Sequence, residues 1–414
     1  MIKFKWETKF KKTEIGEIPR DWEINEIGEV ITQIEKGKVP EKFPGIYPYL
    51  SVDYLRGNLN NTEFYDKKAG VFVTKDDILI IWDGVINAGE IFRGREGLLS
   101  STMCRLEYDK VKIEREYFYH ALKLLEPIIR EARRGTDDRH VDKNMFLGLK
   151  IPYPPPEEQS RIATVLSWFD DLIENKKRQN EILEKVAMAI FKSWFVDFEP
   201  FKDEEFVYSE ELGKEIPEGW EVRKIREFIK IESGGSAPQG EKYFTNGEYP
   251  FVRVKHLSNQ PCINGCDFIN DDAVRHYKLK LFKEGSIIFQ KSGESLSFAR
   301  VNILPFDCYV VNHLAIVDSA MNKRIGFIYC LFKNLLSEII EEQIGTALPY
   351  MKISDIQEKI ILIPSQPILQ HFHSLVEPLF QKIILNQKQI MVLRKIRDAL
   401  LPKLVFGKLR VMEI

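Results

Sequence analysis

The 414-residue chain lacks the motifs that common classes of enzyme require. Residues 235–240 have glycines at phosphate-loop spacing, but Glu241-Lys242 follows where Lys and then Ser or Thr are needed. Cys262 and Cys266 would form half of a zinc site, yet no second ligand pair stands at a usual zinc spacing. The seven histidines form no metal or nucleophile pattern. The sequence therefore predicts no catalytic residues, no metal site and no cofactor, in a chain that is not an enzyme.

Cysteine, charge of one sign and long hydrophobic runs are also scarce. An odd set of five cysteines argues against a disulfide framework and favours a reducing compartment. A net charge of −2 excludes a global positive field, so any nucleic-acid surface is a local patch. Residues 78–82 form one of the longest apolar runs, which is strand-length, and the first residues have no apolar signal core. We expect a soluble, cytoplasmic protein.

The sequence contains an internal repeat of about half its length. Glu17-Ile-Pro-Arg-Asp-Trp-Glu23 returns as Glu215-Ile-Pro-Glu-Gly-Trp-Glu221, 198 positions later. Further matches follow in the same order, with an offset that rises to 212 at Ile151-Pro152 and Ile363-Pro364. Asn175 matches Asn386 at an offset of 211. A slowly drifting offset indicates a duplicated unit with small loop insertions, and each half is long enough for its own core.

Each half reads as a mixed α+β domain followed by one long helix. Short β-rich runs such as 70–73 and 286–289 are separated by Gly, Asn and Asp, and residues 116–134 and 328–344 have helical spacing. The predicted boundaries are 1–153 for the first domain, 154–204 for the central helical segment, 205–365 for the second domain and 366–414 for the C-terminal helical segment.

Apolar residues recur every seven positions in both helical segments. The first segment starts after Pro154-Pro-Pro156 and has no Pro or Gly between residues 157 and 195. The second is expected to start after Pro367 and to end near Pro402 and Gly407. Within it, Asn386 either fixes the register of a core or is a frayed surface site. The residues expected in these helical stripes or beside them are Gln159, Ile162, Phe169, Ile173, Leu183, Ile190, Trp194, Phe195, Phe372, Leu379, Asn386, Leu393 and Leu400.

The charges of the two helical segments are opposite in sign. Residues 156–204 contain eleven acidic and seven basic residues, whereas 366–414 contain three acidic and eight basic ones. This difference favours pairing of the two helices with each other. An antiparallel pair would be a rigid rod with one globular domain at each end. The alternative is that each helix packs on its own domain.

The helical segments carry a family resemblance. Residues 155–163 (PPEEQSRIA), 169–174 (FDDLIE) and 190–200 (IFKSWFVDFEP), with the duplicated Gly-x-x-Ile-Pro-x-x-Trp segments, closely resemble the specificity subunit of Type I restriction-modification enzymes. The resemblance covers nearly the whole chain. In the second half, Pro364-Ser-Gln-Pro367 departs from the Glu-Glu-Gln signature, and the first domain has Glu35-Lys-Gly37 where the second has Ser233-Gly-Gly235.

The resemblance implies an α+β fold with internal pseudo-twofold duplication. Two globular target-recognition domains, separated by two long antiparallel helices that form a coiled coil, would each read one half of a bipartite double-stranded DNA site. The helices would set the spacing and dock two methyltransferase subunits, and through them the motor-nuclease subunits. Such a subunit does no chemistry itself and would work at the nucleoid.

Candidate DNA contacts follow from side-chain chemistry, because Arg or Lys pairs with guanine, Asn or Gln with adenine, and Lys, Arg, Ser and Thr bind phosphate. In the first domain these are Lys36, Lys38, Arg56, Asn58, Asn60, Asn61, Arg93, Arg95, Arg139, His140 and Lys143. In the second they are Ser236, Gln239, Lys242, Arg253, Lys255, His256, Lys291, Ser292 and Arg300. The resemblance adds Thr346, Tyr350 and Lys352, because the residues after the Gly345-Thr346 turn match a family motif that resembles a DNA-facing loop. We expect Arg253 and Lys255 on one face of a strand. Each charge taken singly could equally be a solvated surface group.

Two other classes of function remain open from the sequence. One is a fragment of a fused nuclease or methyltransferase, which would need acidic metal ligands or a cofactor loop. The other is a protein-only scaffold with two ligand-binding heads on a coiled coil.

Overall fold

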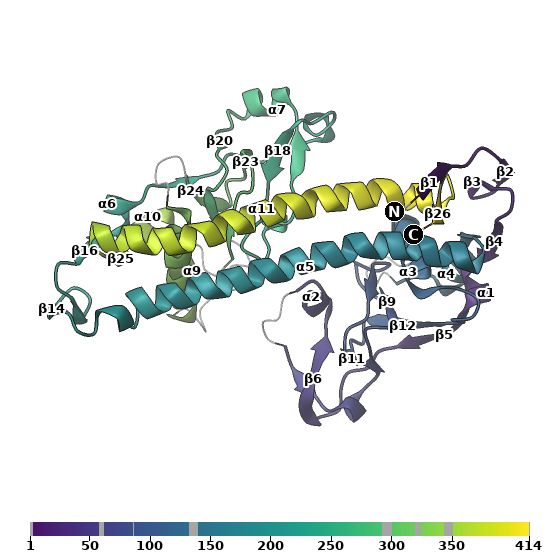
Figure 1. Ribbon diagram of the computed structural model, residues 1–414, viewed down its shortest axis with the longest axis horizontal. Coiled ribbons are helices and arrows are strands. Elements are labelled where there is room, and N and C mark those ends of the chain that lie inside the picture. The colour runs from purple at the N-terminus through teal and green to yellow at the C-terminus, as the bar shows by residue number, and fades with distance from the viewer. Residues whose placement is uncertain are drawn as a thin grey trace. The chain divides into compact units, whose positions relative to one another are not determined.

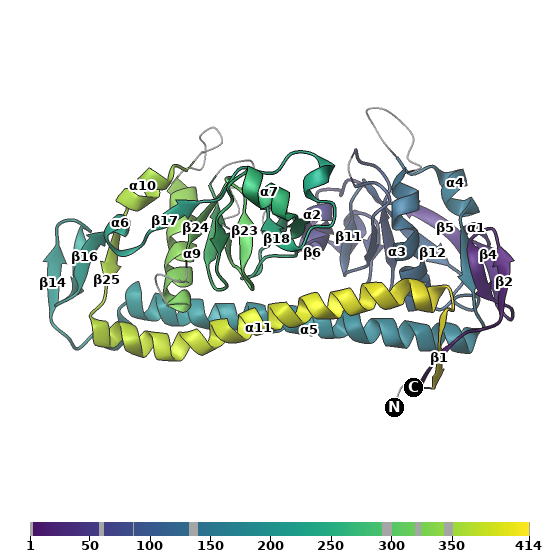
Figure 2. The same ribbon diagram turned by 90° about the horizontal axis from the view of Figure 1, so that it is seen from above.

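The computed structural model divides into two compact units, each of which includes part of both long helices (Figures 1 and 2). Unit 1 comprises Met1–Leu172 and Leu393–Ile414, and unit 2 comprises Ile173–Val392. The structure describes residues 3–57, 62–85, 87–131, 140–291, 300–318, 324–342 and 351–413.

Two four-stranded sheets form the β-rich part of unit 1. The first is antiparallel, with the order β10 (Ile91–Arg93), β9 (Ile78–Ile81), β12 (Met103–Tyr108), β5 (Ile31–Lys36). The second is mixed, with β6 and β11 parallel, in the order β7 (Phe64–Tyr65), β6 (Pro44–Leu50), β11 (Gly97–Leu99), β8 (Phe72–Val73). Three strand pairs complete the unit: β2 (Phe10–Thr13) with β3 (Gly16–Pro19), β4 (Glu23–Glu26) with β13 (Lys150–Tyr153), and β1 (Lys3–Trp6) with β26 (Leu409–Glu413).

Unit 2 has two sheets of the same kind. The first has the order β17 (Ile231–Ser233), β24 (Leu314–Val317), β21 (Ile287–Gln290), β22 (Val301–Ile303). The second has the order β19 (Asp267–Ile269), β18 (Tyr249–Val252), β23 (Cys308–Val310), β20 (Leu281–Phe282), with β18 and β23 parallel. Two further pairs are β14 (Phe206–Ser209) with β15 (Lys214–Pro217) and β16 (Glu221–Lys224) with β25 (Ile360–Ile363).

The described elements of the two units correspond one to one in these sheets, and the helices follow the same order. Unit 1 has α1 (Ile27–Val30), α2 (Val52–Leu55), η1 (Lys67–Ala69), α3 (Arg115–Glu131) and α4 (Lys143–Gly148). Unit 2 has η2 (Glu199–Phe201), α6 (Ile225–Phe228), η3 (Glu241–Tyr243), η4 (Val254–His256), α7 (Asp271–His276), α9 (Ile325–Glu342) and α10 (Ile353–Glu358). The duplication seen in the sequence is therefore a duplication of fold.

The central strands β9 and β21 explain where the sheets obtain their stability. Every residue of β9 (ILII) and of β21 (IIFQ) is buried. Such near-continuous apolar runs are typical of strands covered on both faces. Each strand lies in the interior of its sheet, between two antiparallel neighbours.

The two long helices, α5 (Pro156–Phe195) and α11 (Gln366–Val405), have 40 residues each. In each unit a stretch of α5 lies beside a stretch of α11 that runs in the opposite direction (Figures 1 and 2). In unit 2, Lys176 contacts Gln389 and Phe195 contacts Phe372, so residue numbers fall on α11 as they rise on α5. The antiparallel helix pair is confirmed.

The second helix has nearly its predicted limits. It begins at Gln366, one residue before Pro367, and ends at Val405, between Pro402 and Gly407. It also contains Pro378 in its interior. A proline in a helix removes one backbone hydrogen bond and usually kinks or breaks the helix. Here the buried apolar face of α11, which includes Phe372, Val376 and Phe380 around Pro378, holds the helix together.

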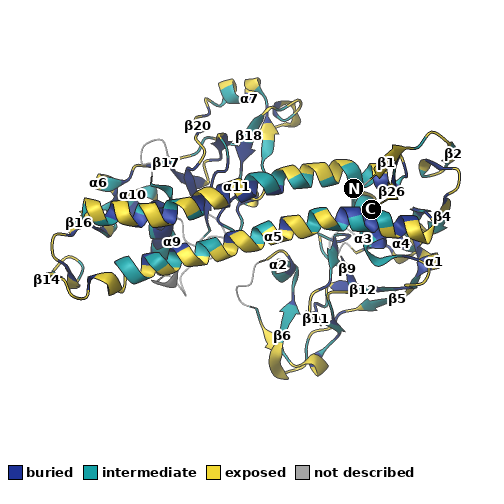
Figure 3. Ribbon diagram, in the orientation of Figure 1, coloured by how far each residue is buried: buried dark blue, intermediate teal, exposed yellow. Residues whose placement is uncertain are grey.

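The buried stripe of α5 is narrower than predicted (Figure 3). Leu166, Ile173, Asn180 and Ala187 are buried at seven-residue intervals, whereas the predicted positions Phe169, Leu183, Ile190 and Trp194 are only partly buried. On α11, Phe372 and Asn386 are buried, and Leu379, Leu393 and Leu400 are partly buried. Ile396, which lies between Leu393 and Leu400 on α11, is exposed.

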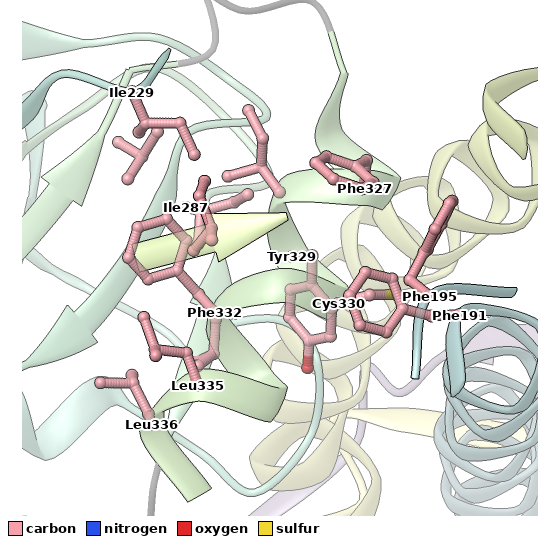
Figure 4. Close-up of a cluster of buried hydrophobic side chains, with 14 of the residues drawn as sticks. Phe191, Phe195, Ile229, Ile287, Phe327, Tyr329, Cys330, Phe332, Leu335 and Leu336 are labelled. Carbon is pink, nitrogen blue, oxygen red and sulfur yellow. The ribbon is translucent and has the colours of Figure 1, made fainter. Parts of the chain in front are cut away.

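An aromatic cluster joins α5, α11 and α9 within unit 2 (Figure 4). The ring of Phe195 lies 4.8 Å from that of Phe372 and 5.5 Å from that of Phe327, and Phe191 lies 5.9 Å from Phe327. Edge-to-face aromatic pairs of this kind contribute roughly 0.5–1.5 kcal/mol each beyond the burial of their area. The domain of unit 2 is therefore packed firmly on its own part of the helix pair.

The repeated Ile-Pro-x-x-Trp segments are structural. Trp22 is fully buried in unit 1, and its indole N–H donates to Glu158 of α5 over 3.1 Å. Trp220 in unit 2 packs against Phe195, Phe198 and Phe201. In both repeats the tryptophan anchors the start of the domain to the adjoining end of the helix pair.

Candidate nucleic-acid interface

Candidate residues lie where β5 ends in unit 1 and where β17 ends in unit 2. We call this place, with the residues that follow β9 or β21 beside it, the corner of each unit. The strand registers show which residues of the two corners are equivalent. In unit 1, Ile80 lies opposite Cys104, which lies opposite Lys36. In unit 2, Phe289 lies opposite Ala315, which lies opposite Ser233. Lys36 and Ser233 thus occupy the same place at the end of β5 and β17.

The glycines that follow confirm this equivalence and correct the sequence alignment by one position. A Cβ on Gly37 would lie 2.1 Å from the carbonyl oxygen of Ser100, and one on Gly234 would lie 2.3 Å from that of Val310. Such distances exclude any side chain. Gly37 therefore corresponds to Gly234, and the sequence comparison that aligned it with Gly235 was wrong.

The corner of unit 1 contains an ion pair between Lys36 and Asp83. The ammonium of Lys36 lies 2.6 Å from the carboxylate of Asp83, the second residue after β9, and both side chains are more than a third exposed. Its hydrogen bond to Asp83 raises the pKa of Lys36. Asp83 also forms a backbone bridge with His140, which brings two of the predicted residues to this corner.

The corner of unit 2 contains a lysine that forms no ion pair with any carboxylate of the described residues. Lys291, the first residue after β21, is 8% exposed, and its ammonium donates to the hydroxyl of Ser233 over 2.9 Å. Burial lowers the pKa of Lys291. Its backbone carbonyl accepts from the N–H of Met351 over 2.9 Å, so the chain just before α10 passes directly beside it.

Arg253, Lys255 and His256 meet at one carboxylate in unit 2. Their side chains lie 3.0, 2.8 and 3.4 Å from Asp267 at the start of β19. The expectation that Arg253 and Lys255 alternate along a strand was wrong, because β18 ends at Val252 and residues 254–256 form a 3-10 helix. Burial lowers the pKa of His256, whose Nδ1 accepts the N–H of Arg253 over 3.0 Å.

Arg93 belongs to a buried ionic network in unit 1. Its guanidinium lies 2.7 Å from Glu116 of α3 and 2.6 Å from Asp170 of α5, and Asp170 also binds Arg397 of α11 over 2.6 Å. Burial lowers the pKa of His120, which adjoins this network, to about 3, so the imidazole is neutral. Arg93 therefore joins the domain to α5 and, through Asp170, to α11.

Arg56 is also held by acidic and amide groups, because it pairs with Glu90 and donates to Asn87 over 3.2 Å. Arg300 is half-buried and donates to Asn259. The other described candidates are exposed, namely Lys38, Arg95, His140, Lys143, Ser236, Gln239, Lys242 and Lys352. The remaining candidates lie outside the described residues: Asn58, Asn60, Asn61, Arg139, Ser292, Thr346 and Tyr350.

The helix pair contains a buried amide contact in unit 2 that the sequence only half indicated. Asn386 donates to Asn180 over 2.9 Å, and both side chains are fully buried. The sequence repeat matched Asn386 with Asn175, which is exposed. Asn180 could have been found from the seven-residue spacing that continues from Leu166 and Ile173.

Some apolar side chains of the long helices point to solvent. On α5 these include Trp168 and Leu172 in unit 1 and Ile182 and Val186 in unit 2. On α11 the exposed set is Leu375, Leu385, Val392 and Ile396. By contrast, the predicted residues Gln159, Ile162, Ile173, Phe195 and Phe372 are buried inside their own units. Gln159, for example, accepts from the backbone N–H of Glu114.

Within the ranges that the structure describes, no group of three or more His, Cys, Asp or Glu residues could hold a metal ion. Over the same ranges, no helix has the length and apolar character needed to cross a bilayer.

The sequence and the fold both match one family. The model of the Type I restriction modification DNA specificity domain matches residues 19–185 and again 217–395. The Type I restriction enzyme MjaIX specificity subunit of Methanocaldococcus jannaschii is 52% identical over 431 residues, which span 100% of this chain and 99% of that protein. The MjaVIII specificity subunit of the same organism is 32% identical over 432 residues, with the same coverage.

A solved structure shares the fold. The crystal structure of the Type I restriction-modification S subunit from M. genitalium superposes with a TM-score of 0.52 at 21% identity, covering 93% of this chain and 96% of that one. Two specificity-domain matches and full-length relatives agree with the duplicated units and the paired helices. The chain belongs to the family of Type I restriction-modification DNA specificity subunits, with the specificity domain present twice.

Proposed function

We propose that each domain reads one half of a bipartite double-stranded DNA site and that the chain itself catalyses no reaction. The observation that carries this proposal is that the two domains share their fold but differ in the polar residues at the corner. The two domains share strand order and a glycine that tolerates no side chain, whereas the adjoining polar residues differ: Lys36 with Asp83 in one, Ser233 with Lys291 in the other. Two domains of the same fold that offer different hydrogen-bonding groups suit a DNA site whose two halves differ in sequence.

For the domain limits we propose 1–153 and 205–365 as the target-recognition domains, and 154–204 and 366–414 as the helical segments that set the spacing between half-sites. The buried contact between Asn180 and Asn386 would fix the register of the helices, as polar residues do at core positions of coiled coils.

The exposed apolar residues of α5 and α11 support docking of methyltransferase subunits on the helices. The proposed complex contains two of them, and through them the motor-nuclease subunits. Exposed apolar side chains that recur along a helix are typical of a protein–protein interface. In unit 2 they include Ile182 at 55% and Val186 at 44% exposure.

Docking can be tested by co-purification of the methyltransferase subunit. Ile182→Glu should weaken it, and Lys185→Gln, at an exposed polar position three residues along the same helix, is the matched control. Equal recovery with both variants would contradict this docking surface. Leu183→Pro should break α5 and abolish assembly altogether.

DNA binding is tested on the assembled complex with duplex DNA over a range of salt concentrations. A DNA reader's log affinity falls linearly with log salt, because bound cations are released. A flat response would refute the proposal and favour a protein-only scaffold. Mapping methylated bases in a host that carries the complex would give both half-sites and the spacer. We expect the complex to act in the cytoplasm, at the nucleoid.

A further inference from the structure

The two corners described above differ in how their lysine is neutralised. In unit 1, Lys36 and Asp83 form a closed, partly exposed ion pair whose net charge is zero. In unit 2 the place of Lys36 is taken by Ser233, and the cation is Lys291, which follows β21, two strands away in the same sheet. The register makes Lys291 equivalent to Trp82, the neighbour of Asp83.

Lys291 is an unusual cation because it is buried and pairs with no acid in the part of the chain that the structure describes. Among the residues that the structure describes, no carboxylate forms an ion pair with it, and its ammonium bonds only the hydroxyl of Ser233. Burying an unpaired charge is unfavourable, and proteins ordinarily pair such groups or bind an ion there. Burial accordingly lowers the pKa of this lysine, with no opposing contribution from an acid.

The groups beside Lys291 suit an anion that approaches from solvent. Ser233 is exposed although its hydroxyl bonds the buried ammonium, so the corner opens outward. The same hydroxyl donates a long hydrogen bond of 3.3 Å to the carbonyl of Asn312, which a phosphate oxygen could replace as the acceptor. A lysine ammonium and a serine hydroxyl are among the groups that bind DNA phosphate oxygens.

We propose that Lys291 and Ser233 bind a backbone phosphate of the DNA, so that the second domain makes a phosphate contact that the first lacks at the equivalent corner. The inference rests on the proposed DNA reading. It adds the position of one phosphate contact and a difference between the two domains. Phosphate contacts fix the orientation of a domain on the duplex and carry no sequence information directly. The second domain therefore contributes more of the salt-dependent, sequence-independent affinity at this corner.

The test compares four full-length proteins in complex with their methyltransferase subunits: wild type, Lys291→Met, Ser233→Asp and Lys283→Met. Binding to random duplex DNA and to the cognate site is measured between roughly 50 and 200 mM salt. Lys291→Met should reduce the salt slope by about 1 and weaken binding by the same factor on both DNAs. Ser233→Asp should do the same, because it gives Lys291 the carboxylate that Asp83 gives Lys36.

Lys283→Met is the matched control, because it also removes one lysine from the same domain. Lys283 is 55% exposed and already pairs with Asp307 at 2.8 Å, so the slope should remain that of the wild type. Thermal unfolding separates binding from a structural role. Removing an unpaired buried cation should leave the melting temperature of the Lys291→Met protein unchanged or higher.

An unchanged slope in both corner variants, with salt-dependent binding by the wild type, would overturn the phosphate contact and leave the proposed function intact. Loss of affinity for the cognate site alone would overturn it too, and would make Lys291 a base reader. A wild-type complex with no salt-dependent binding would refute the proposed function together with this inference.

Discussion

The ionic network around Asp170 allows a quantitative prediction about how the first domain is held on the helices. The carboxylate of Asp170 is 13% exposed and binds Arg93 from the domain and Arg397 from α11, each over 2.6 Å. Burial alone would raise the pKa of Asp170, but the guanidinium groups of Arg93 and Arg397 hold it below its usual value. The carboxylate is therefore charged throughout the neutral range.

Asp170→Ala would leave two arginine side chains facing each other without their shared acid. Removing one partner of a buried ion pair costs about 3–5 kcal/mol. Arg93 keeps Glu116 at 2.7 Å, Arg397 keeps Asp398 at 2.8 Å, and both arginines retain a quarter to a third of their exposure. These remaining contacts and the solvent reduce the expected cost to roughly 2–3 kcal/mol.

Calorimetry of the full chain would measure this cost as a lower melting temperature for unit 1. One kilocalorie shifts a domain of about 150–250 residues by roughly 2–4 °C, so the transition should fall by about 4–12 °C. Asp171→Ala is the control, because it removes the same charge at an exposed neighbouring position of α5. If the two variants melted together, the network would not hold the domain as argued.

Three further predictions concern a titratable group, a helix contact and a corner. Burial lowers the pKa of His120 to about 3, so between about pH 6.5 and 3 the imidazole is protonated in the unfolded chain but not in the folded one. The free energy of unfolding should therefore fall by about 2 kcal/mol between pH 7 and 5. The His120→Gln protein should lack this pH dependence when unfolding is measured over the same range. Asn180→Leu and Asn386→Leu should each lower the free energy of unfolding by about 1–3 kcal/mol, because the remaining buried amide loses its hydrogen-bond partner. The double variant should recover most of that stability. Additive losses of stability in urea unfolding would refute the pairing. Asp83→Ser should release Lys36 and raise the salt slope of DNA binding by up to about 1, and an unchanged slope would place that corner away from DNA.

The helix pair shows what sequence can and cannot supply. The absence of Pro and Gly over 157–195, together with the seven-residue spacing, was enough to predict a helix of nearly the observed length. The spatial partner of Asn386 was not predictable from the repeat. A repeat offset relates residues that occupy equivalent places, whereas antiparallel packing joins residues whose numbers rise on one helix and fall on the other, so Asn386 meets Asn180 and not Asn175.

Several candidate DNA contacts have acidic partners that the sequence did not reveal. Arg93 has the same chemistry as a guanine-reading arginine, and only the fold brings Glu116 and Asp170 to it from distant parts of the chain. Arg253 and Lys255 were placed by strand alternation, which ceased to apply when β18 ended one residue earlier. A charge pattern identifies the residues that are able to bind DNA, and their acidic neighbours decide which remain available.

The corners also explain how specificity can differ between two copies of one fold without loss of stability. Gly37 and Gly234 lie against backbone carbonyls that no side chain would clear, so this position of the frame is fixed by packing. Lys36 and Ser233 precede these glycines at exposed positions, where a substitution removes little buried area. Changes there alter the charge offered to a ligand, from a closed ion pair in unit 1 to a lysine bonded to a serine hydroxyl in unit 2, at little cost to the core. Divergence of the two half-sites would therefore concentrate beside the glycine that both units share, because the side chains there can change while the backbone packing cannot.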